Sequence, residues 1–515
     1  MRFTLSLLLL LGLGSAQTRE VGSKACAGCH SEIYRTYSQT AMAKTSGRVV
    51  ATDFKAFQFR DSTTSADYRL SPDSEGLRLS ISKDDIESQR NLSWFVGSGR
   101  VGKSFLFGLD HFLFQAPVSY YTATGEWALS PGFQRRQTVE MTRAVEPACL
   151  QCHATKIDIN PSTKNGFATE PFHEGGIGCE RCHGPGGAHV VAKSAATIVH
   201  PGKIAAEQSE SVCAQCHLTG TTRIAKYRAD KLTYQPGAKL SDYLSILVAA
   251  PANASAIGVT SHFEKMAQSK CRIASGAKFR CISCHNPHEE PTATERAAYF
   301  RERCQSCHAT KPCKQAGTEN SDCTSCHMPK SSARGVEHAV YTDHSIPRRA
   351  GEQRLESFTG LRDFWGSKVE TRDLGMANAV LGNSAEAIAQ LEAAAKARPA
   401  DVAVLMQLAQ LLDRKGEGQR ANALYEQVLK LEPRNAVAAA NLGVAKIQQG
   451  DASSAVRLWK VALEQNPAQT GIRMNIAMAL YRSGDRAGAK AAVEEALKYE
   501  PDLAAARKLL DSFNH

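Results

Sequence analysis

The stretch that decides the fold runs from Cys179 to His189 and reads CERCHGPGGAH. It opens with two cysteines three positions apart, followed at once by a histidine. The same pattern, Cys-x-x-Cys-His, occurs seven times and takes up 14 of the 16 cysteines. The copies run from Cys26 to His30, Cys149 to His153, Cys179 to His183, Cys213 to His217, Cys281 to His285, Cys304 to His308 and Cys323 to His327.

This spacing is typical of covalent haem attachment. Two thiols three positions apart add to the two vinyl groups of one haem, and the next residue places its imidazole on the iron. Zinc knuckles would need matched pairs of motifs, but successive first cysteines lie 123, 30, 34, 68, 23 and 19 residues apart. The sequence therefore predicts seven haem c groups. In each motif the first cysteine, named above, and the second cysteine are the expected thioether ligands. The second cysteines are Cys29, Cys152, Cys182, Cys216, Cys284, Cys307 and Cys326.

The second axial ligand decides whether each haem is a saturated electron carrier or an open site. His189 is the first candidate, because the Gly-Pro-Gly-Gly stretch before it lets the backbone turn tightly. His288 follows His285 so closely that we expect it to serve a neighbouring haem. The remaining histidine candidates are His173, His200, His262, His338 and His344. For each of them the alternative is a surface or hydrogen-bonded core histidine.

The motif-bearing part of the chain resembles the nitrifier tetrahaem cytochromes of the c-554/c-552 family. The resemblance lies in residues 21–43, in Cys179 to His189 and in Cys281 to His288. It implies the haem packing of that family and a role in electron transfer. The family commonly has a haem-ligating histidine twelve positions after the first motif histidine, where this sequence has Met42. Met42 either binds that iron or only packs against its neighbours. If Met42 does not bind, that haem can be five-coordinate.

The group that shares this packing also contains enzymes, namely hydroxylamine oxidoreductases and pentahaem nitrite reductases. The Cys-x-x-Cys-Lys site of the nitrite reductases is absent, since all seven motifs end in His. We therefore expect an electron-transfer protein rather than a catalyst. The alternatives are an oxidoreductase acting on a small nitrogen or sulfur compound at an open haem, and an assembly protein with structural haems.

The N-terminus predicts export. Arg2 precedes an apolar run from Leu5 to Leu13, and Gly-Ser-Ala follows, which is typical of a signal peptide over residues 1–16. A membrane anchor is the alternative, although the run is shorter than a spanning helix needs. We expect a periplasmic or extracellular protein with no transmembrane segment after cleavage. In that compartment Cys271 and Cys313 either form a disulfide or remain two buried thiols.

The last part of the chain is a helical repeat. Pro399, Pro433, Pro467 and Pro501 lie 34 residues apart, as do Gly382, Gly416, Gly450 and Gly484, which is the tetratricopeptide period. We expect a linker at 351–367 and four repeats with a capping helix at 368–515. Such a solenoid offers a concave surface to another protein. The repeats are predicted to dock a redox partner, with a structural or dimerising tail as the alternative.

The predicted fold class is mainly α. Residues 17–350 are expected to form a haem domain with little regular structure, in which porphyrin supplies much of the core. Residues 51–140 are expected to be a small β insertion, because Phe57 to Arg60, Leu77 to Ile81, Ser104 to Phe107 and Phe112 to Phe114 alternate. The net charge is +11, but haem propionates offset it by roughly 7. Nucleic-acid binding is therefore not implied.

Overall fold

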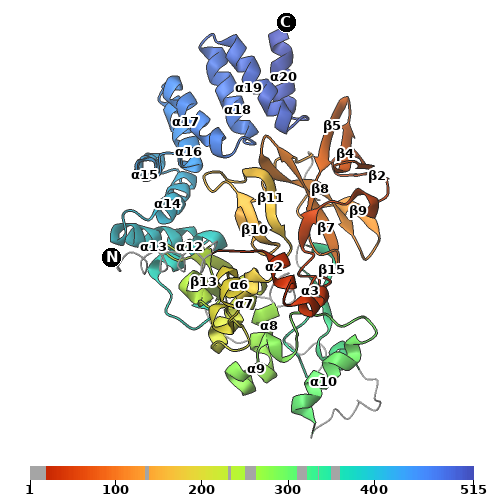
Figure 1. Ribbon diagram of the computed structural model, residues 1–515. Coiled ribbons are helices and arrows are strands. Elements are labelled where there is room, and N and C mark those ends of the chain that lie inside the picture. The colour runs from red at the N-terminus through yellow and green to blue at the C-terminus, as the bar shows by residue number, and fades with distance from the viewer. Residues whose placement is uncertain are drawn as a thin grey trace, which may run out of the picture.

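The computed structural model describes residues 19–133, 139–229, 233–249, 262–309, 322–333, 336–348 and 360–514. In Figure 1 strands gather on the right, a curved row of helices runs along the left and top, and short helices and loops lie below. The predicted signal peptide, residues 1–16, and Cys313 lie outside the described residues. Within the described ranges, every helix is too short or too polar to cross a bilayer.

Nine strands between residues 46 and 129 form two antiparallel sheets. The five-stranded sheet has the order β1-β6-β7-β8-β9, and the four-stranded sheet has the order β2-β3-β4-β5. The strands are β1 (Ser46–Arg48), β2 (Phe57–Arg60), β3 (Asp67–Asp73), β4 (Gly76–Lys83), β5 (Ile86–Leu92), β6 (Trp94–Val96), β7 (Gly102–Leu109), β8 (Phe112–Tyr121) and β9 (Glu126–Leu129).

Alternation along these strands buries one face of each sheet. Tyr68 and Leu70 on β3, Leu79 on β4 and Phe105 on β7 are at most 1% exposed. These residues belong to one apolar cluster that draws on both sheets, so the sheets pack face to face as a sandwich. The strands expected around Phe57, Leu77, Ser104 and Phe112 are confirmed as β2, β4, β7 and β8.

The prediction of a mainly α fold with little regular structure and only a small β insertion is wrong. The described residues contain sixteen strands in five sheets. Two-residue turns explain why the sheets are so extensive. Asp84-Asp85 joins β4 to β5 and Asp110-His111 joins β7 to β8, with positive φ at Asp84, Asp110 and His111. Such turns match the twist of paired strands, so neighbouring segments form strands even where apolar and polar residues alternate only weakly.

Short helices carry the seven motifs or lie between them (Figure 1). They are α2 (Ser23–Ala27), α3 (Ser31–Tyr37), α4 (Pro147–Leu150), α5 (Glu180–His183), α6 (Gly187–Ala192), α7 (Ala206–His217), α8 (His262–Gln268), α9 (Lys270–Ser275), α10 (Arg296–His308) and α11 (Cys323–His327), with 3-10 turns at Ala51–Asp53, Ala195–Thr197, Leu240–Asp242, Gly276–Lys278 and Cys281–Ser283. Five of these helices, α2, α3, α9, α10 and α11, bury none of their residues.

Three small antiparallel sheets complete the motif-bearing part. In the first, β10 pairs with β11. In the second, β13 lies between β12 and β16 and pairs with both, and in the third β14 pairs with β15. The strands are β10 (Ala154–Ile159), β11 (Phe167–Gly175), β12 (Thr222–Ala225), β13 (Leu244–Ala249), β14 (Lys330–Ala333), β15 (Val336–Thr342) and β16 (Leu361–Asp363). β16 follows the last motif in the sequence and pairs with β13. The segment that leads into the repeats is therefore held against the motif-bearing part.

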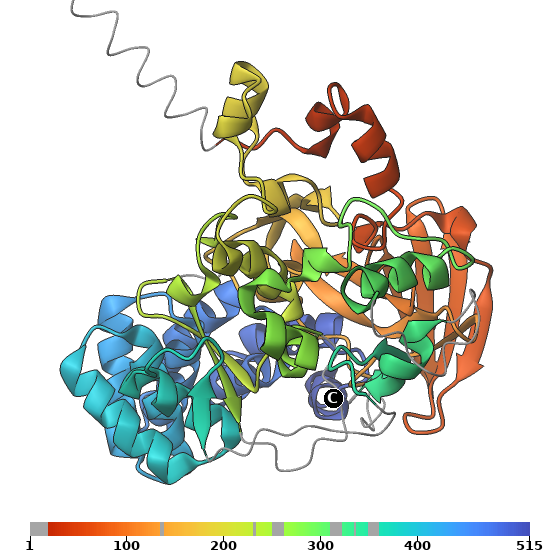
Figure 2. The same cartoon turned by 90° about the horizontal axis from the view of Figure 1, so that it is seen from below.

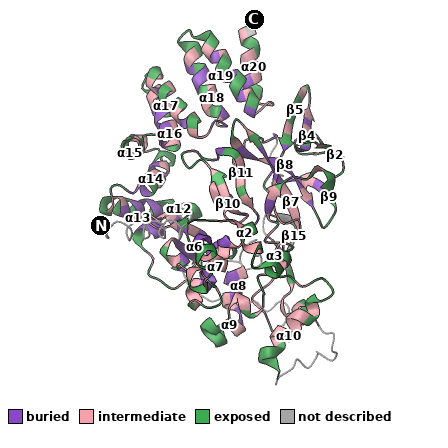
Figure 3. Ribbon diagram, viewed as in Figure 1, coloured by how far each residue is buried: buried purple, intermediate pink, exposed green. Residues whose placement is uncertain are grey.

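The repeat prediction is confirmed as four helix pairs and one further helix. They are α12 (Thr371–Leu381), α13 (Ser384–Ala397), α14 (Val402–Arg414), α15 (Gly418–Leu431), α16 (Ala436–Gln448), α17 (Ala452–Gln465), α18 (Thr470–Arg482), α19 (Arg486–Tyr499) and α20 (Ala504–Asn514). The four glycines spaced 34 residues apart have φ between 82° and 88°, a conformation that lets each first helix end in a left-handed turn. Figure 3 shows buried residues along the inner sides of these helices.

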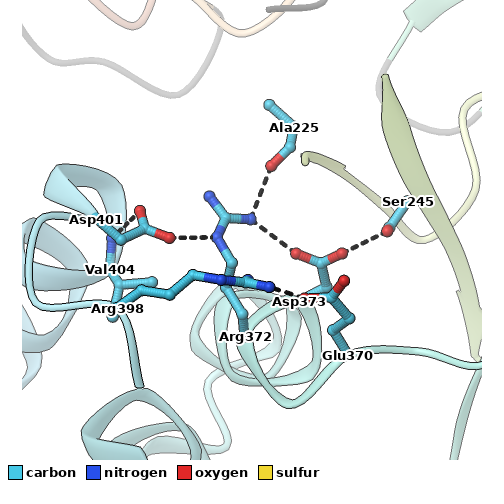
Figure 4. Close-up of polar contacts among 8 residues, drawn as sticks. All are labelled: Ala225, Ser245, Glu370, Arg372, Asp373, Arg398, Asp401 and Val404. Atoms are coloured by element: carbon cyan, nitrogen blue, oxygen red, sulfur yellow. Dashed lines mark hydrogen bonds and ion pairs between the residues drawn. The ribbon is translucent and has the colours of Figure 1, made fainter. Parts of the chain in front are cut away.

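A buried arginine attaches the first repeat to the motif-bearing part (Figure 4). Arg372 on α12 is 5% exposed. Its Nε donates a hydrogen bond to Asp401 at 2.6 Å, and its Nη1 donates to Asp373 at 2.7 Å and to the carbonyl oxygen of Ala225 at 2.8 Å. The hydroxyl of Ser245 on β13 donates to Asp373 at 2.5 Å. Every charge in this network is paired, so burial is tolerated and α12 is fixed on β12 and β13.

The last repeat is attached to the sandwich. Asp110, in the turn between β7 and β8, accepts hydrogen bonds from Lys498 at 2.7 Å and from the Tyr499 hydroxyl at 2.8 Å. Tyr499 is 1% exposed and packs in the apolar cluster of the sandwich. The hydroxyl of Thr142 donates to Glu500 at 3.0 Å. The first and the last repeat therefore both contact the rest of the chain. Figure 2 gives the view from below, with the repeats in blue.

Candidate haem-binding site

One continuous cavity of about 4190 Å³ lies among the motif-bearing helices. Pockets that hold one drug-sized ligand have roughly 300–1,000 Å³, so this space is large enough for several bulky groups. Residues of every motif line it, and the lining includes all seven motif histidines, His30, His153, His183, His217, His285, His308 and His327. The structure thus brings together motifs that are spread over about three hundred residues of sequence.

Each motif is built on a tight turn. The amide of His30 donates to the carbonyl oxygen of Cys26 at 2.9 Å, and the amide of His183 donates to that of Cys179 at 2.9 Å. In such a turn residues three and four positions apart lie on one side of the backbone, which brings both thiols and the imidazole of a motif to one side. The fifteen cysteines that the structure describes form no disulfide with one another, so both thiols of every motif fit thioether attachment.

Three motif histidines face a second histidine across the cavity. The ring centres of His30 and His189 lie 6.2 Å apart with 16° between the ring planes, and those of His183 and His288 lie 5.9 Å apart with 7°. The rings of His285 and His344 lie 6.2 Å apart at 27°. These are long distances for ring stacking.

The separations suit a metal between the two rings. Metal–imidazole bonds are about 2 Å long, so two of them on opposite sides of one iron put the ring centres about 6 Å apart. The three facing pairs have about this separation. The space and the donors at these positions therefore fit an iron held by two imidazoles.

A fourth motif histidine lies in a cluster. His217 on α7 is 5.5 Å from His262 on α8, with the rings at 86°. His262 is also 4.8 Å from His344, which in turn faces His285. Two candidates from the sequence analysis, His262 and His344, thus meet the fourth and fifth motifs at one place in the cavity.

Hydrogen bonds orient several of these rings. Nδ1 of His183 lies 2.8 Å from the carbonyl oxygen of Val199, and Nδ1 of His189 lies 3.0 Å from that of Ser194. His327 and His344 make the same contact, at 3.0 Å, with the carbonyl oxygens of Pro347 and Thr342. When Nδ1–H donates to a carbonyl, Nε2 carries the lone pair. In this tautomer each of these rings has the lone pair of Nε2 free for a metal.

Burial keeps the imidazoles neutral. Desolvation lowers the pKa of His183 and His217 below the ordinary value, and it lowers the pKa of His285 to about 4 and that of His262 to about 3. The neighbouring imidazoles of the cluster lower these pKa values further. Only a neutral imidazole can bind a metal, so the cavity favours the ligating form.

The remaining motif histidines and ligand candidates lie outside these facing pairs. Within the described side chains, no second histidine ring faces His153, His308 or His327. His200 lines the cavity near His183 and His288. His173 lies on β11 and is exposed outside the cavity lining. The side chain of His338 lies outside the described part of the structure.

Met42 lines the cavity, but the structure associates its backbone with the second motif. The hydroxyl of Thr45 donates to the carbonyl oxygens of Met42 at 3.0 Å and of His153 at 2.9 Å. The ring that faces His30 is His189. Sequence offset from the first motif had pointed to Met42, whereas spatial position favours His189 for that motif.

Thiols of different motifs also lie next to one another, which the sequence did not signal. There are three such pairs, Cys26 with Cys179, Cys152 with Cys216, and Cys213 with Cys281, in which the neighbouring thiol raises the pKa of Cys26, Cys216 and Cys281. The first motif is therefore adjacent to the third, and the fourth is adjacent to both the second and the fifth. Groups attached at these motifs would be close neighbours.

Four family models match parts of the chain. The family "Cytochrome c554 and c-prime" matches residues 122–184, which contain the second and third motifs. A doubled CXXCH motif matches residues 273–312, which contain the fifth and sixth. Tetratricopeptide repeat models match residues 372–421, 406–470 and 446–512. The chain joins a multihaem cytochrome c region to tetratricopeptide repeats.

A curated relative of the multihaem cytochrome region is the multiheme cytochrome MtrA of Shewanella baltica (strain OS185), 26% identical over 182 residues. The match covers 32% of this chain and 53% of MtrA, so the chain spans about half the length of that relative.

Solved structures of MamA match 28% of this chain. One titled "Crystal structure of MamA protein" is 20% identical with 78% of its length covered, and one titled "MamA AMB-1 P212121" is 26% identical, also with 78% covered. Both have a TM-score of 0.26. A likeness at this level carries no argument about function.

Proposed function

We propose that the chain is an exported electron-transfer protein that holds seven covalent haem c groups in one cavity. The observation that carries the proposal is the 4190 Å³ cavity lined by all seven motifs, in which motif histidines face second histidines about 6 Å away. A haem with two imidazole ligands exchanges single electrons at low potential and has no free site for a substrate. Adjacent motifs support transfer from one haem to the next.

We assign the axial ligands from the facing rings. His189 would complete the haem of His30, His288 that of His183, and His344 that of His285. His262 would complete the haem of His217. Met42 is then a candidate for the haem of His153, to which its backbone is linked through Thr45. The role of these residues is to fix the iron and to set its potential through the ligand type.

A second candidate function is favoured by the motifs of His153, His308 and His327. These three histidines lack a facing histidine within the described side chains, so an iron there could keep an open position. An open haem could bind a small nitrogen or sulfur compound. The chain would then be an oxidoreductase supplied with electrons by its other haems.

EPR of the oxidised protein, together with a potentiometric titration, separates the two. The carrier proposal predicts only low-spin signals, reversible reduction of all haems and no change on adding nitrite or hydroxylamine. A high-spin signal that shifts with either compound would establish the oxidoreductase instead. Haems that cannot be reduced reversibly would favour a structural role.

For the repeats we propose two roles, which involve different surfaces. Tetratricopeptide repeats support docking of a redox partner, and the sides of α16 and α18 expose Val437, Val444, Met478 and Tyr481. The buried Arg372 network and the Asp110 contacts favour a second role, in which the repeats brace the sandwich against the motif-bearing part. Deleting residues 368–515 separates the two roles. If the repeats brace the molecule, the haem region becomes less stable, whereas if they only dock a partner, its stability is unchanged.

We also propose a periplasmic or extracellular location. Multihaem c-type cytochromes are typically extracytoplasmic, and residues 1–16 have the composition of a signal peptide. Mass spectrometry of the mature N-terminus tests this, since cleavage near Ala16 is expected. A chain that retains residues 1–16 and stays with the membrane fraction would be anchored instead.

A further inference from the structure

The carboxylate of Glu180 joins two segments that are distant in the sequence. Glu180 is the second residue of the third motif and is 7% exposed. Its Oε1 accepts hydrogen bonds from the amide of Val21 at 2.9 Å and from that of Gly186 at 2.7 Å. Its Oε2 accepts from the amides of Gly22 at 2.8 Å and Val21 at 3.2 Å. Three backbone amides thus depend on one side chain.

These amides precede the two histidines of one facing pair. Val21 and Gly22 lead into α2, which opens the first motif and so sets the position of His30. Gly186 lies three residues before His189, at the start of α6. The rings of His30 and His189 have centres 6.2 Å apart. One carboxylate therefore anchors both segments that present this pair.

We propose that Glu180 is the positioning residue that holds His30 and His189 at the separation that one iron requires. The inference rests on the proposed function, because it takes these two rings as ligands of the first haem. Hydrogen bonds to a carboxylate are about twice as strong as neutral ones. Because the carboxylate is almost fully buried, water cannot readily replace it. The first segment also binds the amide of Cys179 through the Ser23 hydroxyl and the amide of Gly187 through the Arg19 carbonyl, each at 2.9 Å. Its short helices bury no residues, and Glu180 accepts more of its hydrogen bonds than any other described side chain.

Glu174 provides a matched control. Its Oε1 accepts a hydrogen bond from the amide of Ser23 at 3.1 Å, so it binds the same N-terminal segment one residue further on. No hydrogen bond links it to Gly186, which Glu180 binds. Loss of Glu174 weakens the attachment of the segment but leaves Glu180 joining it to the His189 loop.

The experiment uses the full-length, haem-loaded protein and four variants, Glu180→Ala, Glu180→Gln, Glu174→Ala and His189→Ala. Haem content by mass spectrometry and the oxidised EPR spectrum are measured for each. With haem content unchanged, we expect Glu180→Ala to lose one haem's low-spin signal and gain a high-spin one, as His189→Ala does. Glu180→Gln should recover part of the low-spin signal, because one acceptor oxygen remains. Glu174→Ala should keep the original spectrum.

Four outcomes overturn the inference, and they are distinguishable. If His189→Ala changes the spectrum but Glu180→Ala does not, the ligand pair stands and the role of Glu180 is wrong. If His189→Ala changes nothing, the ligand pair itself is wrong. If Glu174→Ala and Glu180→Ala have the same effect, Glu180 acts only as general structure. Should Glu180→Ala fail to mature, Glu180→Gln decides, and a wild-type spectrum for it refutes the inference.

Discussion

Helices α14 and α10 both contain 13 residues, yet α14 buries six of them and α10 buries none. The first belongs to the repeats and packs its leucines and valines between neighbouring helices. The second carries the sixth motif and borders the cavity. The repeats thus build their core from their own side chains, whereas the motif-bearing part encloses a space that side chains leave open. This contrast is the one expected if haem completes the core of the motif-bearing part.

The largest expected effect is that of removing haem. A chain produced without haem attachment should lose the ordered structure of α10 and α11, because these helices have no buried side chains to hold them. The repeats should stay folded. Limited proteolysis with mass spectrometry measures this, with rapid cleavage expected within 296–308 and 323–327 and slow cleavage within 402–499. Equal resistance of α10 and α14 would show that the motif-bearing part is stable without a cofactor.

The next effect concerns the contact between the two regions. Arg372→Met should cost roughly 3–5 kcal/mol, because it leaves Asp373 and Asp401 buried without a cation. Urea unfolding followed by circular dichroism at 222 nm gives the change in unfolding free energy. Arg420→Met is the matched control, since Arg420 also pairs with two carboxylates but is 53% exposed. The control should change stability by about 0–1 kcal/mol, and an equal loss in both variants would contradict the buried network.

A core substitution within the repeats should leave the haems untouched. Leu412 on α14 is 1% exposed, and Leu412→Ala should cost about 2–5 kcal/mol through lost burial and the cavity left behind. Unfolding of the repeats, followed by circular dichroism, should shift to lower urea, while the Soret absorption of the folded protein is unchanged. A simultaneous change in the haem spectrum at low urea would mean that the two regions do not have separate cores.

The smallest effect is expected at the far end of the repeats. Asp110→Asn weakens the contact with Lys498, but both side chains are 40% exposed, so the cost should be under about 1 kcal/mol. Tyr499 remains buried in the sandwich cluster. Thermal unfolding checks this, and a loss as large as that of Arg372→Met would mean that the two attachments contribute equally.

The same contrast explains what the sequence could predict. The repeats were predicted because each helix pair packs against its neighbour, so the 34-residue period is visible locally. The number of strands in the sandwich was underestimated. A two-residue turn such as Asp110-His111 marks strand pairing in the sequence less clearly than a 34-residue period marks the packing of helices. The facing histidines could not be paired from sequence, since His288 lies beside His285 in the chain but faces His183 in space. A ligand offset likewise pointed to Met42, where the structure brings His189 to His30.

The central claim is that all seven motifs hold haem in one cavity. The most direct test is mass spectrometry of the purified full-length chain and of its protease-derived cysteine peptides. The account predicts seven covalent haems per chain and a haem on each of the seven motif peptides. Recovery of any motif peptide with free thiols or with a disulfide in place of haem would contradict it.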